Sequence, residues 1–288
     1  MFSLFLAILS SSSIAWLFKI TESGNYNRYR VTTANYGVAF FVSLILFLSN
    51  VIKQGSQFNV TQIHWSSVLG VGIPAGFCFF LSLVFYQKSV KENGASLSGM
   101  FGKLGILLPM VIAIVIWHEI PTLIQTLGIC LAIAAMIYVN YTPGQGGLKN
   151  KKTSLIMLFF AGGMAEFSNK MFQKMGQVAD KSLFLFVVFF VAFCLSLFKS
   201  FNVIEGEGTS AKKDYLIGGI VGIPNLLSSV FLISALGSIP ATVAFPIYSS
   251  GAIALITLGS FLFFREEISK KSWIALGLTM IAMILVNI

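Results

Sequence analysis

The residues Val-Gly-Ile-Pro occur twice in this chain, at 71–74 and at 221–224, 150 positions apart in a sequence of 288 residues. Each copy lies inside a long apolar run. Each is followed by a second apolar run, an acidic residue and a third apolar run. The third runs end alike, in Met-Ile-Tyr-Val-Asn at 136–140 and Met-Ile-Leu-Val-Asn at 283–287. The chain therefore contains one structural unit twice, and any fold must accommodate two related halves.

The composition indicates that the lipid bilayer is the solvent and partner of this chain. Hydrophobic residues make up 56% of the sequence and charged residues only 10%, whereas a soluble domain carries about 25% charged residues. A membrane-spanning helix needs roughly 20 mostly apolar residues, and the strands of a β-barrel are shorter and alternate in polarity. We therefore predict an all-α integral membrane protein with ten transmembrane helices. They lie near 2–18, 32–52, 66–86, 95–117, 122–141, 154–173, 182–199, 215–237, 241–263 and 271–288.

A glycine-rich, basic stretch after the fifth run predicts the boundary between the halves. We assign residues 1–142 to the first five-helix repeat, 143–152 to a linker and 153–288 to the second repeat. Because five is odd, the second repeat must enter the membrane inverted relative to the first. Inverted repeats of this kind are typical of secondary transporters, with the substrate site between the halves.

The loop charges predict an orientation in the cell membrane. Fourteen of the 19 Lys and Arg residues lie in the loops that follow the odd-numbered runs, and four lie in the loops that follow the even-numbered runs. The positive-inside rule then places the loop of Arg28 and Arg30, the linker and the 265–271 loop in the cytoplasm, with both termini outside. The net charge of +9 reflects this pattern and does not indicate a nucleic-acid partner.

The ends of the two halves carry a family resemblance. The first reads Trp-His-Glu-Ile-Pro-Thr-Leu-Ile-Gln-Thr-Leu-Gly at 117–128, and the second reads Phe-Arg-Glu-Glu-Ile-Ser-Lys-Lys-Ser-Trp-Ile-Ala-Leu-Gly at 264–277. An acidic residue, a short polar turn and a glycine-containing last helix resemble the end of an EamA repeat. The chain as a whole resembles the EamA-like branch of the drug/metabolite transporter superfamily. The resemblance implies alternating access to a central cavity lined by the first four helices of each half.

Ionisable residues at membrane depth are costly and are site candidates by default. Lys103 lies about nine residues into the fourth run, too deep to reach either interface easily, and we expect it to line the cavity. Glu166 and Lys170 lie in the sixth run, four positions apart on one helix face, and the two could instead neutralise each other. Lys19 is the repeat counterpart of Lys170, and both could simply extend to opposite interfaces.

Neutral polar residues complete the predicted substrate cavity. Asn225 follows the repeated proline, and Tyr248 and Ser249 follow another proline in the ninth run; hydrogen bonding between helices is the alternative role for all three. A proline inside a helix frees a backbone carbonyl and bends the helix. We therefore expect hinges at three positions, with static packing kinks as the alternative: Pro74, Pro224 and Pro246.

The sequence carries no recognised catalytic, phosphate-binding or metal-binding pattern, so we predict a protein that is not an enzyme and needs no cofactor or metal. We expect a secondary transporter for a small polar metabolite, such as an amino acid or a related anion or zwitterion, coupled to H⁺ or Na⁺. Two alternatives stay open: efflux of drugs or toxic organic cations, and a membrane scaffold without transport. The protomer could act as a monomer or as a homodimer.

Overall fold

The computed structural model of the chain describes residues 1–23, 26–55, 59–93, 102, 104–140, 152–201, 210–264 and 270–287. Within these residues the regular structure is entirely helical. The helices are α1 (Phe2–Ser23), α2 (Arg28–Gln54), α3 (Trp65–Asn93), α5 (Leu107–Trp117), α6 (Leu123–Asn140), α7 (Lys152–Met175), α8 (Lys181–Phe201), α9 (Ala211–Leu236), α10 (Ala241–Phe264) and α11 (Lys270–Asn287). Two single turns of 3₁₀ helix, Val60–Gln62 and Val178–Asp180, precede α3 and α8.

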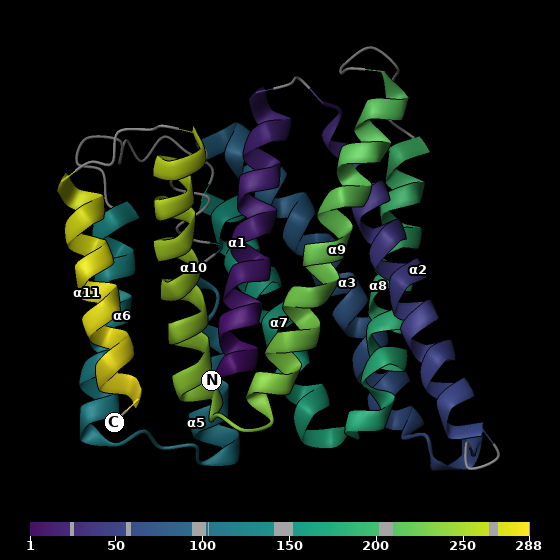
Figure 1. Cartoon of the computed structure of the whole chain (residues 1–288), viewed down its shortest axis with the longest axis horizontal. Helices are drawn as coiled ribbons and strands as arrows, with labels where there is room; N and C mark the ends of the chain where they lie inside the picture. The colour runs from purple at the N-terminus through teal and green to yellow at the C-terminus, as the bar shows by residue number, and fades with distance from the viewer. Residues whose placement is uncertain are drawn as a thin grey trace.

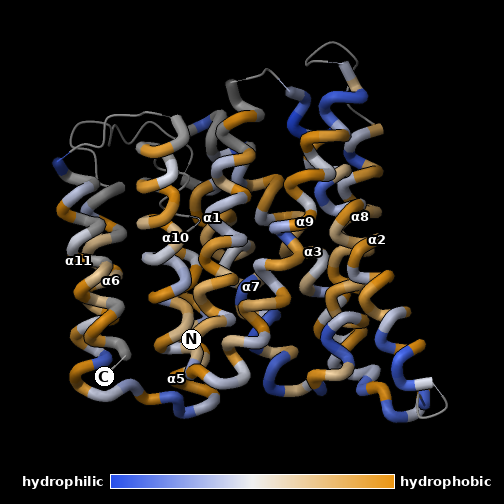
Figure 2. Tube along the Cα trace, viewed as in Figure 1, coloured by the Kyte–Doolittle hydropathy of each residue, from blue (hydrophilic) through white to orange (hydrophobic). Residues whose placement is uncertain are grey.

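Four described segments are long and apolar enough to cross a bilayer, namely Arg28–Gln54, Trp65–Tyr86, Val178–Phe201 and Ala211–Leu236. Shorter apolar helices occupy Phe2–Leu17, Leu107–Trp117, Leu123–Ala135 and Ala241–Ile256. Large apolar side chains face outward on many of these helices, which suits contact with lipid tails, and hydrophilic residues gather mainly at the helix ends (Figure 2). The all-helical, membrane-type fold is confirmed, while the number of ten spans stays a prediction.

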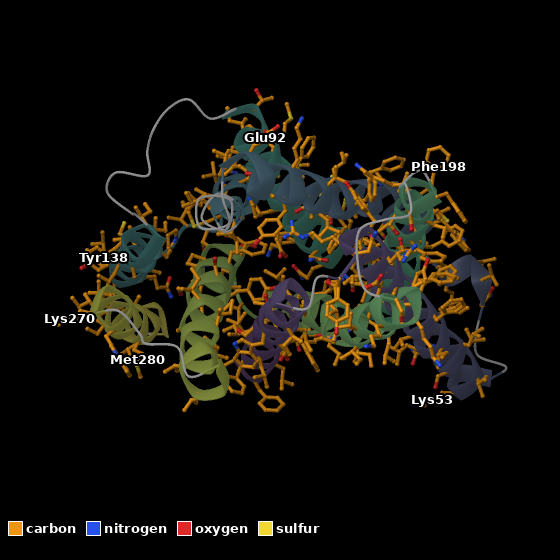
Figure 3. All side chains as sticks on the ribbon, turned by 90° about the horizontal axis from the view of Figure 1, so that it is seen from above. Lys53, Glu92, Tyr138, Phe198, Lys270 and Met280 are labelled. Carbon is orange, nitrogen blue, oxygen red and sulfur yellow. The ribbon has the colours of Figure 1, made fainter. Side chains whose placement is uncertain are left out.

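The helices run up and down between two sides, which we call upper and lower as they lie in Figure 1. Both chain termini lie on the lower side. Helices α5, α7, α3 and α8 form one row, and helices α10, α1, α9 and α2 form a second row beside it (Figure 3). Contacts of α2 with α8 and of α5 with α10 join the rows at their ends. The pair formed by α6 and α11 stands outside this ring.

Glycines at the repeated motif let helices of different halves approach closely. A Cβ added to Gly72 on α3 would meet the side chain of Val187 on α8 at 3.1 Å. A Cβ added to Gly222 on α9 would meet Val38 on α2 at 2.9 Å and the carbonyl oxygen of Asn35 at 2.5 Å. Small residues are used in this way where helices pack in membranes. The Val-Gly-Ile-Pro motif therefore marks the two helix contacts α3–α8 and α9–α2.

Candidate functional site

A polar cluster lies where α1, α7, α9 and α10 meet. The hydroxyl of Tyr248 on α10 lies 2.8 Å from the hydroxyl of Ser228 on α9, and both residues are buried. The side chain of Ser11 on α1 lies next to the hydroxyl of Tyr248, and the carboxylate of Glu166 on α7 lies within electrostatic range of it. Buried polar side chains need partners, and here each partner comes from a different helix. The cluster thus ties four helices of the ring together through polar contacts.

Helix α7 supplies a polar face to this region. The amide nitrogen of Asn169 donates to Glu166 Oε2 at 3.3 Å, which turns the amide oxygen of Asn169 away from the carboxylate. Among the residues that the structure describes, that oxygen is buried without a hydrogen-bond partner, and so is Oε1 of Gln173, one turn further along α7. Residues spaced by three, four and seven positions share one face of a helix. The face therefore presents hydrogen-bond acceptors that a bound donor could satisfy.

A second polar cluster lies at the lower end of α7. Lys170 is only 1% exposed, and its ammonium lies 2.7 Å from Glu119 Oε1. Lys174, one turn further on, lies 3.1 Å from the same oxygen. Both ammonium groups lie over the ring of Trp117, at 5.8 and 5.9 Å from its centroid. One carboxylate from the first half thus compensates two lysines of the second half, and the three groups carry a net charge of +1.

The loop that places Glu119 is built from local signals. His118, the residue that follows the last residue of α5, adopts the left-handed backbone conformation with φ of 52°. This conformation is uncommon for a residue with a side chain. Helix α6 then starts with a capping box. The Gln125 side chain accepts from the Thr122 amide at 3.1 Å, and the Thr122 hydroxyl accepts from the Gln125 amide at 3.2 Å. The sharp turn and the cap hold Glu119 between them.

Glu119 also caps a helix of the other half. The backbone N–H of Ala241, the first residue of α10, donates to Glu119 Oε2 at 2.6 Å. A carboxylate at a helix N-terminus satisfies a free amide and interacts favourably with the helix dipole. Burial works to raise the pKa of Glu119, but the hydrogen bonds from Lys170, Ala241 and Lys174 outweigh it and hold that pKa below its usual value. Glu119 is therefore an anion that joins the 118–122 loop to α7 and α10.

The predicted site residues fall into three groups. Glu166 and Tyr248 come together in the polar cluster, with Ser249 buried beside Tyr248 in sequence. Lys170 belongs to the Glu119 cluster; its described ion pair is with Glu119, not with the carboxylate one turn away on its own helix. Lys103 and the side chain of Lys19 lie outside the described residues.

Asn225, three residues before Ser228 on α9, bridges the two halves. Its amide nitrogen donates to the side-chain oxygen of Asn35 on α2 at 3.0 Å. The three predicted hinge prolines all lie inside helices, Pro74 in α3, Pro224 in α9 and Pro246 in α10. Their role as hinges stays a prediction.

Several residues of these clusters were not among the predicted site residues. Ser11 belongs to the run of four serines at 10–13, and Ser228 lies one turn after the repeated proline. Both are polar residues inside predicted spans, and this property could have identified them as site candidates. Asn169 adjoins Lys170 in the sequence and points its amide at Glu166. Glu119 ends an apolar run in the sequence, a position that favours a structural or interfacial role. Its partners are 51 and 122 positions away, so no local pattern identifies them.

Comparisons with known proteins agree with this architecture. Residues 1–141 match the EamA-like transporter family, and residues 184–279 match the Small Multidrug Resistance protein family. An uncharacterized protein of Haemophilus influenzae is 28% identical over 287 residues, covering 96% of this chain and 94% of its own length. One solved crystal structure superposes with a TM-score of 0.73 at 15% identity, covering 99% of this chain and 96% of that one, which supports the fold alone. Residues 1–141 therefore match an EamA-like transporter domain, and the two family matches point to a membrane transporter.

Proposed function

We propose that this chain is a secondary transporter that moves a small polar metabolite, an amino acid or a related anion or zwitterion, across the cell membrane by alternating access. The observation that carries the proposal is the polar cluster of Glu166, Tyr248, Ser228 and Ser11. Its groups come from α1 in the first half and from α7, α9 and α10 in the second. A site built from both halves changes shape when the halves move relative to each other, as alternating access requires.

The packing of the ring supports the division into inverted repeats, 1–142 and 153–288, joined by the linker. Counting spans in order, the repeat counterparts are α1 and α7, α2 and α8, α3 and α9, and α5 and α10. In every pair one helix belongs to the first row and its counterpart to the second. A twofold axis in the membrane plane relates two rows in this manner. With Glu119 holding Lys170 at the lower end of α7, we propose that this state is closed on the lower side.

Substrate charge follows from which ionisable groups reach the cavity. Lys170 is compensated by Glu119, so Glu166 remains as the acid of the cluster and Lys103 as the proposed base. A zwitterion would bind to both Glu166 and Lys103, whereas an anion would bind to Lys103 alone. Reversible protonation of Glu166 is the proposed route by which transport would be coupled to H⁺, with Na⁺ as the alternative ion.

A second candidate, efflux of organic cations, is favoured by the match of residues 184–279 to the Small Multidrug Resistance protein family. A cation would be attracted by Glu166 and by the acceptor oxygens of Asn169 and Gln173. This candidate predicts that Glu166 is required for transport and that Lys103 is not.

The test combines a ligand screen with transport in proteoliposomes. A panel of metabolites and drugs is first screened for compounds that raise the unfolding temperature of the purified protein, since a ligand of the folded state stabilises it. Transport of each hit is then compared for the wild type, Lys103→Ala, Glu166→Gln and the control Lys53→Ala, which changes an exposed lysine at the end of α2. Loss of transport in both Lys103→Ala and Glu166→Gln indicates a zwitterionic substrate. Loss of transport in Glu166→Gln alone indicates a cation, and loss in Lys103→Ala alone indicates an anion. A folded protein that transports no hit contradicts the proposal and favours a scaffold. Transport that is equal in all variants contradicts the roles proposed for Lys103 and Glu166.

A further inference from the structure

A small pocket lies on the upper side, where the start of α2, the upper part of α3 and the end of α8 meet. Its apolar wall comes from one face of α3, with Phe80, Leu83 and Val84. Its polar groups are the side chains of Tyr29 and Thr32 from α2 and those of Ser196 and Lys199 from α8. An apolar wall with one cation at its edge matches an amphiphile that carries negative charge.

The lower side contains a structurally related junction. Helices α2 and α8 share the residues Phe-Phe-Val, at 40–42 and 189–191, and α3 and α9 share Val-Gly-Ile-Pro. In these alignments three residues of the lower junction correspond to pocket residues. Lys181 corresponds to Thr32, Ser234 to Val84, and Asn50 to Lys199.

Direct hydrogen bonds join the helices at this lower junction. Lys181 Nζ donates to the hydroxyl of Ser234 at 2.8 Å, and the Asn50 amide donates to the hydroxyl of Ser182 at 3.2 Å. At the upper junction the position of Ser234 is taken by Val84, which has no hydroxyl, and a pocket lies between the helices. Among the described residues, the upper junction therefore lacks the direct hydrogen bond that joins the helices at the lower one, and a small pocket lies there instead.

The surroundings of the pocket are basic. Lys199 Nζ lies over the ring of Tyr29 at 5.7 Å, and no carboxylate in the part of the chain that the structure describes is paired with it. Arg28 is exposed next to Tyr29, and exposed Lys88 lies one turn beyond Val84 on the same face of α3. The acid further along α3, Glu92, lies two turns beyond Val84.

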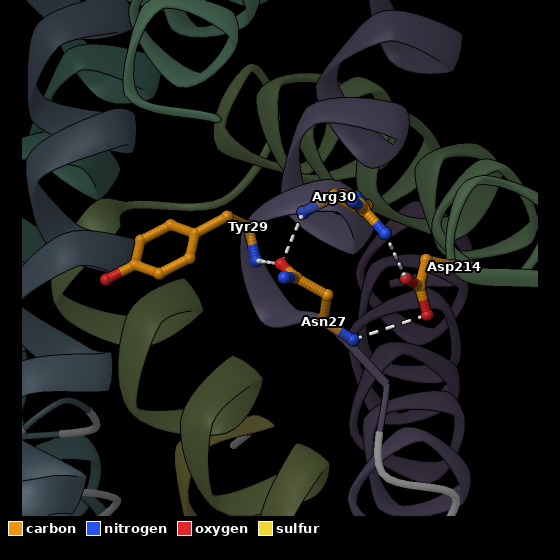
Figure 4. Close-up of polar contacts among 4 residues, drawn as sticks. All are labelled: Asn27, Tyr29, Arg30 and Asp214. Carbon is orange, nitrogen blue, oxygen red and sulfur yellow. Dashed lines mark hydrogen bonds and ion pairs between the residues drawn. The ribbon is translucent and has the colours of Figure 1, made fainter. Parts of the chain in front are cut away.

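The acid on the neighbouring helix α9 is turned away from the pocket. Asp214 is fully buried, and it accepts from the Asn27 amide at 3.3 Å and pairs with Arg30 at 3.5 Å. Figure 4 shows Arg30 and Tyr29 on opposite sides of the first turn of α2, with Asp214 on the Arg30 side. Phe198, next to Lys199, points outward at the edge of the molecule, so this end of α8 is open to lipid (Figure 3).

We propose that this pocket binds the phosphate-bearing headgroup of an anionic phospholipid. Lys199 interacts with the phosphate, the hydroxyl of Tyr29 donates a hydrogen bond to one of its oxygens, and the acyl chain lies along Phe80 and Leu83. Basic pockets between transmembrane helices on the cytoplasmic side bind such headgroups, and the loop charges predict the upper side to be cytoplasmic. Lipid binding at this site does not depend on a transported substrate, so it can be tested separately from the proposed function.

The test uses the full-length protein, delipidated in detergent and titrated with phosphatidylglycerol or phosphatidylcholine, with bound lipid counted by native mass spectrometry. We expect one phosphatidylglycerol to bind in preference to phosphatidylcholine. Lys199→Ala should weaken that binding about fivefold, the effect of one basic residue on an anionic headgroup. Lys53→Ala, at the lower end of α2, is the matched control and should leave the binding unchanged. Leu83→Trp keeps every charge but fills the pocket, and should also weaken it.

Each variant is first compared with the wild type by size-exclusion chromatography and thermal unfolding, so that misfolded protein is set aside. Equal binding of the two lipids, or equal loss in Lys199→Ala and Lys53→Ala, overturns the proposal. Competition by millimolar inorganic phosphate without any effect of Leu83→Trp would overturn it as well, because that result describes a site for a free anion.

Discussion

Removal of Glu119 should destabilise the protein more than any other single change in the two polar clusters. Glu119→Gln leaves the Lys170 ammonium, 1% exposed, without its anion at 2.7 Å. Breaking a buried ion pair on one side costs about 3–5 kcal/mol. Glu119 is itself 11% exposed and its second partner, Lys174, is 36% exposed, so we expect the lower end of that range, about 3 kcal/mol. Glu119→Ala also uncaps α10 at Ala241, which adds about 1 kcal/mol.

A double-mutant cycle separates the ion pair from general damage. Lys170→Met removes the buried charge and leaves Glu119 paired with Lys174 and Ala241, so it should cost only about 1 kcal/mol. Glu119→Gln combined with Lys170→Met should be about as stable as Lys170→Met alone, giving a coupling of about 2–3 kcal/mol. The free energy of unfolding is measured in mixed micelles with increasing dodecyl sulfate, with secondary structure followed by circular dichroism. A double variant as unstable as Glu119→Gln would refute the reasoning.

Three further predictions concern other contacts. Gly222→Leu should destabilise the protein by about 1–3 kcal/mol, because its Cβ would meet the Asn35 carbonyl at 2.5 Å, whereas Gly70→Leu, with open space around it, should not; thermal unfolding compares the two. Folding lowers the pKa of Glu119, so the ionised carboxylate stabilises the folded protein fully above the ordinary glutamate pKa of about 4.3. This stabilisation is lost as the pH falls through the pKa of Glu119 in the folded state. Glu119→Gln should therefore make unfolding less sensitive to acid. Asp214→Ala removes a buried carboxylate that holds Arg30 and the Asn27 amide, and should cost about 2–3 kcal/mol by the same unfolding assay; an effect under about 0.5 kcal/mol would contradict the contact.

Much of the fold could be predicted because apolar length and repetition are local properties of a membrane chain. The runs near 32–52 and 182–199 coincide with α2 and α8, and the glycines of Val-Gly-Ile-Pro lie at helix contacts as their spacing indicates. The boundaries differ by a few residues where caps decide them. Asn27, for example, accepts from the Tyr29 and Arg30 amides and starts α2 earlier than the hydropathy does.

The site was harder to predict because its contacts join distant segments. The i to i+4 spacing of Glu166 and Lys170 suggested one ion pair within a helix, but the described partner of Lys170 is Glu119 from a loop of the other half. Sequence spacing identifies neighbours within a helix, whereas the arrangement of helices in the ring decides the partners between them. Tyr248 was identified from its depth in the membrane, and its partners Ser228 and Ser11 depend on how α9 and α1 pack around it.

If the halves move relative to each other during transport, a covalent cross-link between them on the lower side should stop transport. Asn50 Nδ2 and Ser182 Oγ lie 3.2 Å apart, one in each half. Asn50→Cys and Ser182→Cys are combined in a protein whose native cysteines, Cys78, Cys130 and Cys194, are replaced by serine. In proteoliposomes, with a substrate found by the ligand screen, oxidation should stop transport and a reductant should restore it, while each single cysteine variant stays active. Transport that continues unchanged in fully cross-linked protein would contradict alternating access through this side.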